Sequence, residues 1–345
     1  MKLRIVEELE GEIAHFYEPS TSTNIFSKFN TFWGSVNATK FEFSVPVTFK
    51  QEVFGTLRVN RRLLRLDKSS AAFNYQRDGI VVLYQGIIYF YDLRHKKLIT
   101  TGRLRQCRNV LHCGIAVTKE AIYFGEYGAN TNREAVPVWR STDGGRSWSI
   151  IFEFSAGKIR HVHGVQFDQY SESLWITTGD FAGECYLVNV RKENFEDLIM
   201  YGDGNQKWRP VSLLFDKQKI YWVMDSQLET SYLQVFDRRT KQLEQKRDFP
   251  GPVWYSKRLL DNVSMLATTV EIGSGSKIKN ANVYASTDCL SWNELVSFRK
   301  DFLPLKYFKF GVVGFADGAQ DSSDFVMFGE ALNNFDGKIF RAMIE

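Results

Sequence analysis

Acidic side chains follow several of the predicted short strands, where they could exchange protons with a substrate. Crowded carboxyl groups push their pKa values apart, so one can stay protonated beside an ionised neighbour. Cleavage of a glycosidic bond uses one carboxyl group in each state. We predict a catalytic set at equivalent strand ends, made up of Glu126, Asp180, Asp225 and Glu271. Asp180 and Glu126 would be the acid and its base or nucleophile partner, and Glu330 follows a further strand in the same way.

Basic and aromatic side chains near these acids could hold a sugar. Guanidinium groups bind carboxylates through paired hydrogen bonds, and aromatic rings offer apolar platforms. The predicted substrate-binding residues are Arg160, His161, His163, Arg209, Trp254, Tyr255, Tyr127 and Arg133. An oligosaccharide or polysaccharide is therefore the predicted partner.

The His161-Val-His163 segment is a second source of chemistry. Side chains two residues apart lie on one face of a strand, so both imidazoles should point the same way. We expect both imidazoles to donate hydrogen bonds to a ligand. On this reading the protein needs no metal or other cofactor. The alternative is a divalent-metal site formed by His112, His161 and His163, because imidazoles are common transition-metal ligands.

A repeat indicates which elements position these residues. Ser141-Thr-Asp-Gly-Gly-Arg-Ser-Trp148 has a shorter relative downstream, Ser286-Thr-Asp-Cys-Leu-Ser-Trp292. Phe124-Gly-Glu126 returns as Phe328-Gly-Glu330. The spacings fit three steps of about 48 residues and four steps of about 51, close to the length of a four-stranded propeller blade. Aromatic residues, which favour strands, make up 15% of the chain.

The fold predicted from this pattern is an all-β propeller forming a single domain over residues 1–345. We expect six blades, with seven as the alternative. Residues 61–345 would form the regular blades, and residues 11–60 an irregular blade or a decorating hairpin. Residues 2–9 alternate apolar and charged side chains and should pair with residues 339–344, closing the ring and removing exposed sheet edges.

The Ser141–Trp148 segment resembles the Asp-box, or BNR repeat, of sialidases and related propellers. That resemblance implies a turn between the third and fourth strands of a blade, with Asp and Ser side chains binding turn amides and the Trp packed between sheets. We expect Trp148 and Trp292 to be largely buried.

Residues 105–300 resemble bacterial BNR-repeat, sialidase-like proteins more widely. The matching stretches are Gly125–Tyr127, Ile159–Gly164, Trp175–Asp180, Gly251–Tyr255 and Val270–Glu271. The resemblance implies an arginine triad, for which the candidates are Arg133, Arg160 and Arg209, and a Tyr–Glu pair drawn from Tyr127 or Tyr255 with Glu126 or Glu271. No Phe-Arg-Ile-Pro segment is present, which argues against sialidase activity itself. Propeller lyases such as oligogalacturonate lyase hold a metal through Gln-x-x-His-x-His, but Lys158 stands at the Gln position here.

Composition limits the function classes. The chain has 44 basic and 40 acidic residues in 345, a net charge of +4, which is too balanced to predict a nucleic-acid partner. No stretch is apolar enough to predict a membrane span. The N-terminus does not resemble a signal peptide, and four scattered cysteines suggest reduced thiols. We therefore expect a cytoplasmic protein.

These observations lead to one main functional hypothesis. We expect a carbohydrate-active propeller with glycoside hydrolase-like cleavage of an oligosaccharide at the channel rim. One alternative is a propeller that binds a sugar or a protein without catalysis. A second is a metal-assisted polysaccharide lyase. If the chain is an enzyme, a glycosidase is the expected class.

Overall fold

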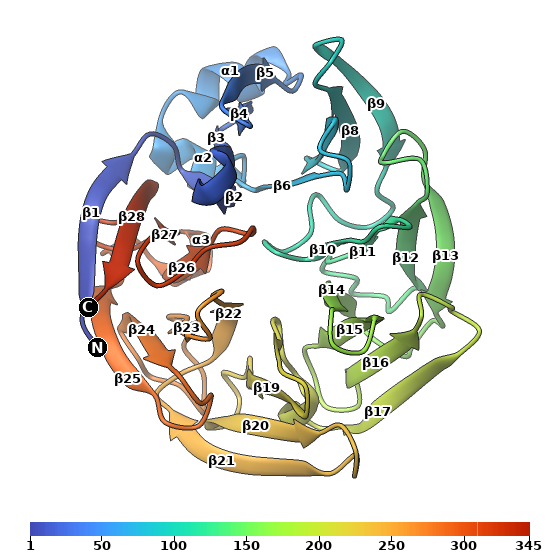
Figure 1. Cartoon of the computed structure of the whole chain (residues 1–345), viewed down its shortest axis with the longest axis vertical. Helices are drawn as coiled ribbons and strands as arrows, with labels where there is room; N and C mark the ends of the chain where they lie inside the picture. The colour runs from blue at the N-terminus through green and yellow to red at the C-terminus, as the bar shows by residue number, and fades with distance from the viewer. Residues whose placement is uncertain (309) are drawn as a thin grey trace. The chain divides into compact units, whose positions relative to one another are not determined.

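The chain consists mainly of short antiparallel strands. A computed structural model describes residues 1–308 and 310–345. Each sheet contains four strands, and in most sheets these follow one another in sequence as a meander. Repeated four-stranded meanders are the blades of a β-propeller, and Figure 1 labels strands from each of these sheets.

The described residues form seven such sheets, so the prediction of six blades was wrong and its seven-blade alternative holds. The additional blade comes from residues 13–44, which form four strands of six residues each. Its strands lie at the beginning of the 11–60 region, which contains none of the repeat motifs used to count the blades.

The chain divides into two compact units. The first contains residues 1–68, 227–231 and 247–345, and the second contains residues 69–226 and 232–246. The predicted catalytic acids fall into both units: Glu126, Asp180 and Asp225 belong to the second, and Glu271 to the first.

The first unit holds three sheets. One comprises β2 (Ile13–Glu18), β3 (Thr23–Lys28), β4 (Thr31–Val36) and β5 (Thr39–Ser44). Another comprises β22 (Val253–Arg258), β23 (Ser264–Thr268), β24 (Asn280–Ser286) and β25 (Asn293–Arg299). The third joins β26 (Val312–Phe315), β27 (Phe325–Glu330) and β28 (Lys338–Ile344) to β1 (Leu3–Leu9).

The first and last strands of the chain pair, as predicted. Strand β1 runs antiparallel to β28, with Leu3 opposite Ile344 and Leu9 opposite Ile339. Figure 1 shows the two strands side by side near both ends of the chain. The N-terminal strand therefore completes a sheet whose other three strands come from the C-terminus.

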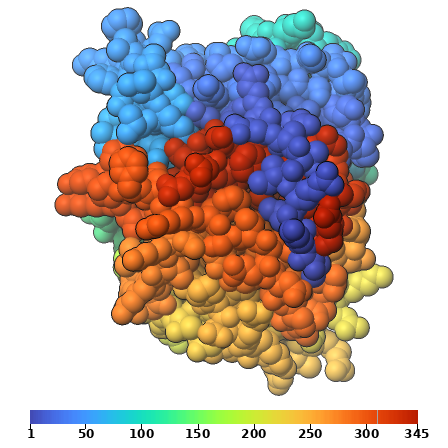
Figure 2. Space-filling view, turned by 90° about the vertical axis from the view of Figure 1, so that its left-hand side faces the viewer, coloured from blue at the N-terminus to red at the C-terminus, as the bar shows by residue number. Residues whose placement is uncertain are grey.

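Short helices follow the β2–β5 sheet. They are α1 (Phe49–Gly55) and α2 (Arg58–Leu64), while α3 (Leu305–Phe308), η1 (Pro19–Thr21) and η2 (Gln206–Trp208) lie elsewhere. Thr48 caps α1 with a reciprocal hydrogen-bonded box to Gln51, a common helix start. Arg62 on α2 pairs with Asp301 at 2.6 Å, and Figure 2 shows this helical segment, in light blue, beside the orange segment near residue 300.

The second unit holds four sheets, apart from the ends of β20 and β21. Their strands are β6 (Ser69–Phe73), β7 (Gly79–Tyr84), β8 (Ile87–Asp92) and β9 (Lys97–Arg103); β10 (Ile115–Val117), β11 (Ile122–Gly125), β12 (Val136–Ser141) and β13 (Ser149–Phe154); β14 (His161–Asp168), β15 (Ser173–Gly179), β16 (Cys185–Arg191) and β17 (Leu198–Gly204); and β18 (Leu214–Phe215), β19 (Lys219–Val223), β20 (Ser231–Asp237) and β21 (Leu243–Phe249).

One edge strand of each sheet is its most exposed strand. Every residue of β15 is buried, whereas most of β17 is at least partly exposed. Val138, Val162, Ile176 and Val188 are fully buried in one cluster that joins neighbouring sheets. This packing fixes β14 and β15, whose ends carry the histidines and Asp180.

The two Asp-containing repeats both lie in turns between the third and fourth strands of a sheet, as the resemblance implied. Asp143 accepts hydrogen bonds from the backbone amides of Arg146 and Ser147. Trp292 is buried, as expected. Trp148 was expected to be largely buried but is only half-buried, because its ring packs on the edge of a cluster beside Phe124.

Candidate functional site

The candidate site lies in the second unit and is centred on Asp180, directly after β15. We call it the Asp180 centre and define it as Arg160, His161, His163, Asp180, Arg209 and Asp225. Arg160 Nη1 donates to Asp180 Oδ2 at 2.8 Å, and Arg209 Nη2 donates to Oδ1 at 3.0 Å. His163 Nε2 lies 3.1 Å from the same Oδ1 atom.

Strand pairing explains why these side chains meet. His161, the first residue of β14, lies opposite Gly179, the last residue of β15. The pairing shifts between Val162 and Gly164, and a shift of this kind re-aims side chains locally. The rings of His161 and His163 lie 5.1 Å apart, so the two imidazoles lie close together, as expected from their spacing.

Backbone carbonyls fix the protonation of one nitrogen in each imidazole. His161 Nδ1 lies 2.7 Å from the oxygen of Gly128, and His163 Nδ1 lies 2.9 Å from that of Pro210. A carbonyl oxygen can only accept, so each Nδ1 must carry a proton. Both Nε2 atoms therefore face Asp180.

His161 Nε2 is the less satisfied of the two. It lies 3.3 Å from Asp180 Oδ1 but is not aligned for a hydrogen bond, and it is buried with no hydrogen-bond partner among the described residues. Because orphaned buried polar atoms are rare in folded proteins, this nitrogen is a candidate ligand atom.

The carboxyl group of Asp180 stays ionised in this setting. Burial alone would raise its pKa, but its contacts with His161 and His163 outweigh burial and hold the pKa far below the ordinary value. The group can therefore accept hydrogen bonds or bind a cation, and it is poorly suited to donate a proton.

Asp225 and Glu126 have different roles. Asp225 is a partner of Arg209, with 3.3 Å between its Oδ2 and Nη2, so it belongs to the Asp180 centre. Glu126 is 1% exposed, and its oxygens accept from the backbone amides of Arg105 and Gln106 and from Trp139 Nε1. Glu126 therefore ties a turn to its blade.

A partly exposed edge adjoins the centre. Arg133 and Arg160 each lie with the guanidinium carbon 5.5 Å from the ring centre of Phe181, and Phe181 is 45% exposed. Arg133 pairs with Glu184 at 2.5 Å. The ring of Tyr127 packs on His161 at 4.2 Å.

The remaining predicted residues are not members of the Asp180 centre. Glu271, Trp254 and Tyr255 belong to the first unit, where Trp254 packs on Phe310 at 5.3 Å. His112, proposed as a third metal ligand, is not in the metal-compatible cluster, which among the described residues contains His161, His163 and Asp180.

Sequence reasoning missed several contributors to the centre. The carbonyls of Gly128 and Pro210 orient the imidazoles, yet backbone groups leave no mark on residue type. Gln206 supports the Asp180 loop by donating to the backbone oxygen of Asp180 at 3.0 Å. Phe181 could have been found, because it directly follows the Gly179-Asp180 pair.

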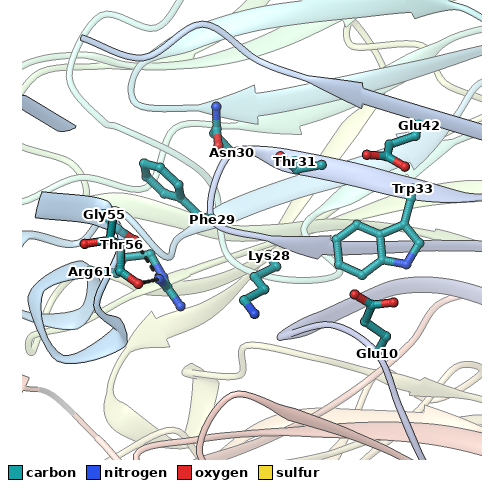
Figure 3. A pocket seen from close by; sticks show the side chains of 10 residues that line it. All are labelled: Glu10, Lys28, Phe29, Asn30, Thr31, Trp33, Glu42, Gly55, Thr56 and Arg61. Atoms are coloured by element: carbon teal, nitrogen blue, oxygen red, sulfur yellow. Dashed lines mark hydrogen bonds between the residues drawn. The ribbon is translucent and has the colours of Figure 1, made fainter. Parts of the chain in front are cut away.

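The first unit contains a separate pocket that the sequence did not suggest. It encloses about 390 Å³, which is within the range of small-ligand sites. Its lining residues are Glu10, Lys28, Phe29, Asn30, Thr31, Trp33, Glu42, Gly55, Thr56 and Arg61. In Figure 3 the indole of Trp33 lies between the carboxylates of Glu10 and Glu42.

Comparison with known proteins supports the fold. No protein-family model matches the chain, and no curated protein matches it. One chain in the crystal structure of a mitotic checkpoint complex superimposes with a TM-score of 0.57 at 7% identity, over 100% of this chain and 93% of that one. The extracellular domain of a proposed hybrid two-component system from B. thetaiotaomicron gives 0.57 at 10% identity, over 99% of this chain and 39% of that one. Similarity at such low identity establishes the β-propeller fold and leaves activity open.

Proposed function

We propose that this chain is a binding propeller that recognises an acidic saccharide at the edge of the Asp180 centre. The observation that carries the proposal is the pair of guanidinium groups on Phe181. Each uses Nε and Nη1 in hydrogen bonds, and within the described residues neither Nη2 has a partner. Two such donors beside an exposed aromatic ring suit a sugar that carries a carboxylate.

The environments of the acids favour binding over cleavage. Glycosidic cleavage needs a carboxyl group that gives and takes a proton. The lowered pKa of Asp180 disfavours it as the proton donor, and three N–H groups occupy the carboxylate of Glu126. Of the functions expected from the sequence, non-catalytic sugar binding is thus the best supported. The β-propeller fold is compatible with such a role.

The experiment is a calorimetric titration of the chain with tetragalacturonate and with a neutral tetragalactan. We expect measurable binding of the acidic oligosaccharide and at least tenfold weaker binding of the neutral one. Arg160→Ala should weaken acidic binding at least tenfold, the effect of losing about one charge-assisted hydrogen bond. Arg191→Ala is the matched control, because this exposed arginine pairs with Asp197 and is not part of the Asp180 centre.

Equal affinity for both oligosaccharides, or an unchanged affinity in Arg160→Ala, would overturn the proposal. The same mixtures should be assayed for products. Hydrolysis lost in Asp180→Asn would support the glycosidase hypothesis instead. Unsaturated products that absorb in the ultraviolet would support the lyase alternative.

A further inference from the structure

Three potential metal-ligand atoms converge in the Asp180 centre. A nitrogen of His161, a nitrogen of His163 and a carboxylate oxygen of Asp180 all lie within 4.8 Å of one another. Both histidines are almost completely buried, at 3% and 1% exposed. This grouping of the three atoms is explained neither by the packing of the strands nor by the proposed contact of Arg160 with a saccharide.

The hydrogen bonds around the imidazoles leave both Nε2 lone pairs directed at a carboxylate. Each Nδ1–H is donated to a backbone carbonyl, so a neutral ring presents its Nε2 lone pair toward Asp180 Oδ1. A proton on His163 Nε2 would relieve one of these contacts, because that nitrogen is aligned for a hydrogen bond to Oδ1 at 3.1 Å, whereas the contact of His161 Nε2 at 3.3 Å would remain unsatisfied. A proton on His161 Nε2 would not be aligned with an acceptor in the described structure.

We propose that His161 Nε2, His163 Nε2 and Asp180 bind a divalent first-row transition-metal ion. Such an ion would accept a lone pair from each of the three atoms. It would therefore give His161 Nε2 a partner, whereas a proton on that nitrogen would have no aligned acceptor. Ligands roughly 2.0–2.2 Å from zinc, at angles of about 90–110°, lie about 2.9–3.5 Å from one another. The two nitrogen–oxygen separations, 3.3 and 3.1 Å, fall in that range, and all three atoms lie within 4.8 Å of one another.

The groups behind the ligands also match a metal centre. Metal-bound histidines commonly donate their other ring N–H to a carbonyl, and ligating carboxylates are themselves hydrogen-bonded. Here Gly128 and Pro210 hold the imidazoles, while Arg160 and Arg209 hold Asp180.

The ligand set indicates the class of metal. Two imidazoles with one carboxylate suit zinc, iron(II), nickel and manganese, and leave coordination positions open. Asp225 offsets the charge of Arg209. Asp180 neutralises only part of the charge of a divalent ion, so the open coordination positions suit an anionic ligand. The inference goes beyond saccharide binding and can be tested with metal alone.

The test uses the full chain, stripped with EDTA and titrated with Zn²⁺ by calorimetry and with Co²⁺ by visible absorption. We expect one ion per chain, with a dissociation constant in the micromolar range or below and ligand-field bands from cobalt. His161→Gln and His163→Gln should each weaken binding more than about a hundredfold, which exceeds the usual loss when only a group behind a ligand is removed. His95→Gln is the matched control, because His95 is exposed and contacts Asp92.

Absence of one-to-one binding by the wild-type chain would overturn the inference, as would unchanged affinity in His161→Gln. If the substituted chains unfold, ¹⁵N NMR of the wild-type imidazoles decides. Zn²⁺ should then shift the Nε2 signals of His161 and His163 and leave that of His95 unchanged; Nε2 signals that do not move would refute the site. A chain that binds metal but no saccharide would refute only the proposed function.

Discussion

Asp180 is the residue on which the candidate site depends, because four side chains direct nitrogen atoms at its two oxygens. Arg209 is nearly buried, with a side chain 4% exposed, so its charge is costly without a partner. Without Asp180, Arg209 would retain Asp225 at 3.3 Å, but Arg160 and the two buried histidines would lose the carboxylate that they face, and breaking such buried pairs is strongly destabilising. The stability of the second unit should therefore be sensitive to this carboxylate.

Asp180→Ala should lower the free energy of unfolding by about 3–5 kcal/mol. Asp197→Ala should cost less than about 1 kcal/mol, as for other exposed pairs, since Asp197 contacts Arg191 with both side chains about half exposed. Urea denaturation of the two variants and the wild type gives the comparison. Equal losses in both variants would show that Asp180 has no structural role.

Glu126→Gln separates a structural from a catalytic acid. The substitution turns one acceptor oxygen into an N–H donor that faces an N–H group, so we expect a loss of about 1.5–3 kcal/mol in unfolding free energy. Saccharide affinity should not change, because Glu126 lies outside the Asp180 centre. A fully stable variant that has lost a measurable cleavage activity would contradict this assignment.

Part of the Asp180 centre could be predicted from residue types and their spacing in the sequence. The two-residue spacing of His161 and His163 and the position of Asp180 at a strand end were sufficient to group them. The same strand-end rule selected Glu126, whose environment differs because a neighbouring turn supplies amides to its carboxylate. Strand-end position can be read from a sequence, whereas the partners of a carboxylate depend on the packed structure.

At the scale of elements, the Asp-containing turns stabilise the ends of two blades. Asp288 accepts hydrogen bonds from the amides of Ser291 and Leu290, and these bonds, the Ser291 amide first, lower its pKa to about 2. For Asp143 burial acts in the opposite direction, but hydrogen bonds, chiefly from Ser147, still lower the pKa. Carboxylates of this kind favour the folded state only while ionised.

Asp288→Asn should therefore change the pH dependence of stability. Because the folded pKa is below the unfolded value of about 3.9, the contribution of Asp288 is complete above about pH 4 and is lost as the pH falls toward about 2. The difference in unfolding free energy between wild type and Asp288→Asn should shrink over that interval. A difference that stays constant from about pH 5 to about pH 2 would contradict the role of this turn.

The blade formed by β2–β5 shows why the blade count could not be read from the sequence. Its strands lack the Ser-x-Asp turn that marks two other blades. The helices α1 and α2 follow at once, so the region does not keep the repeat length. Conversely, the alternating pattern of residues 2–9 was enough to predict the pairing of β1 with β28.

At the scale of the whole molecule, β1 ties the N-terminus to the last sheet. Deleting residues 1–9 should lower the melting temperature by several degrees and promote self-association, because β28 would then present an unpaired edge. Val6→Ser is the control, because Val6 is 47% exposed and lies at a shift in the pairing, so its melting temperature should stay close to that of wild type. A truncated chain as stable and monomeric as wild type would show that the pairing is dispensable.

The division into two units also bears on function. Three of the predicted catalytic acids and both paired histidines belong to the second unit, whereas the 390 Å³ pocket beside Trp33 belongs to the first. Saccharide recognition is proposed at the Asp180 centre, and the pocket beside Trp33 is the alternative binding site.

A crystal structure of the chain soaked with tetragalacturonate tests that placement most directly. We predict a sugar ring against Phe181 and a sugar carboxylate within hydrogen-bond distance of Nη2 of Arg160 or Arg133. An oligosaccharide bound in the pocket beside Trp33, with the Phe181 surface vacant, would contradict the central claim.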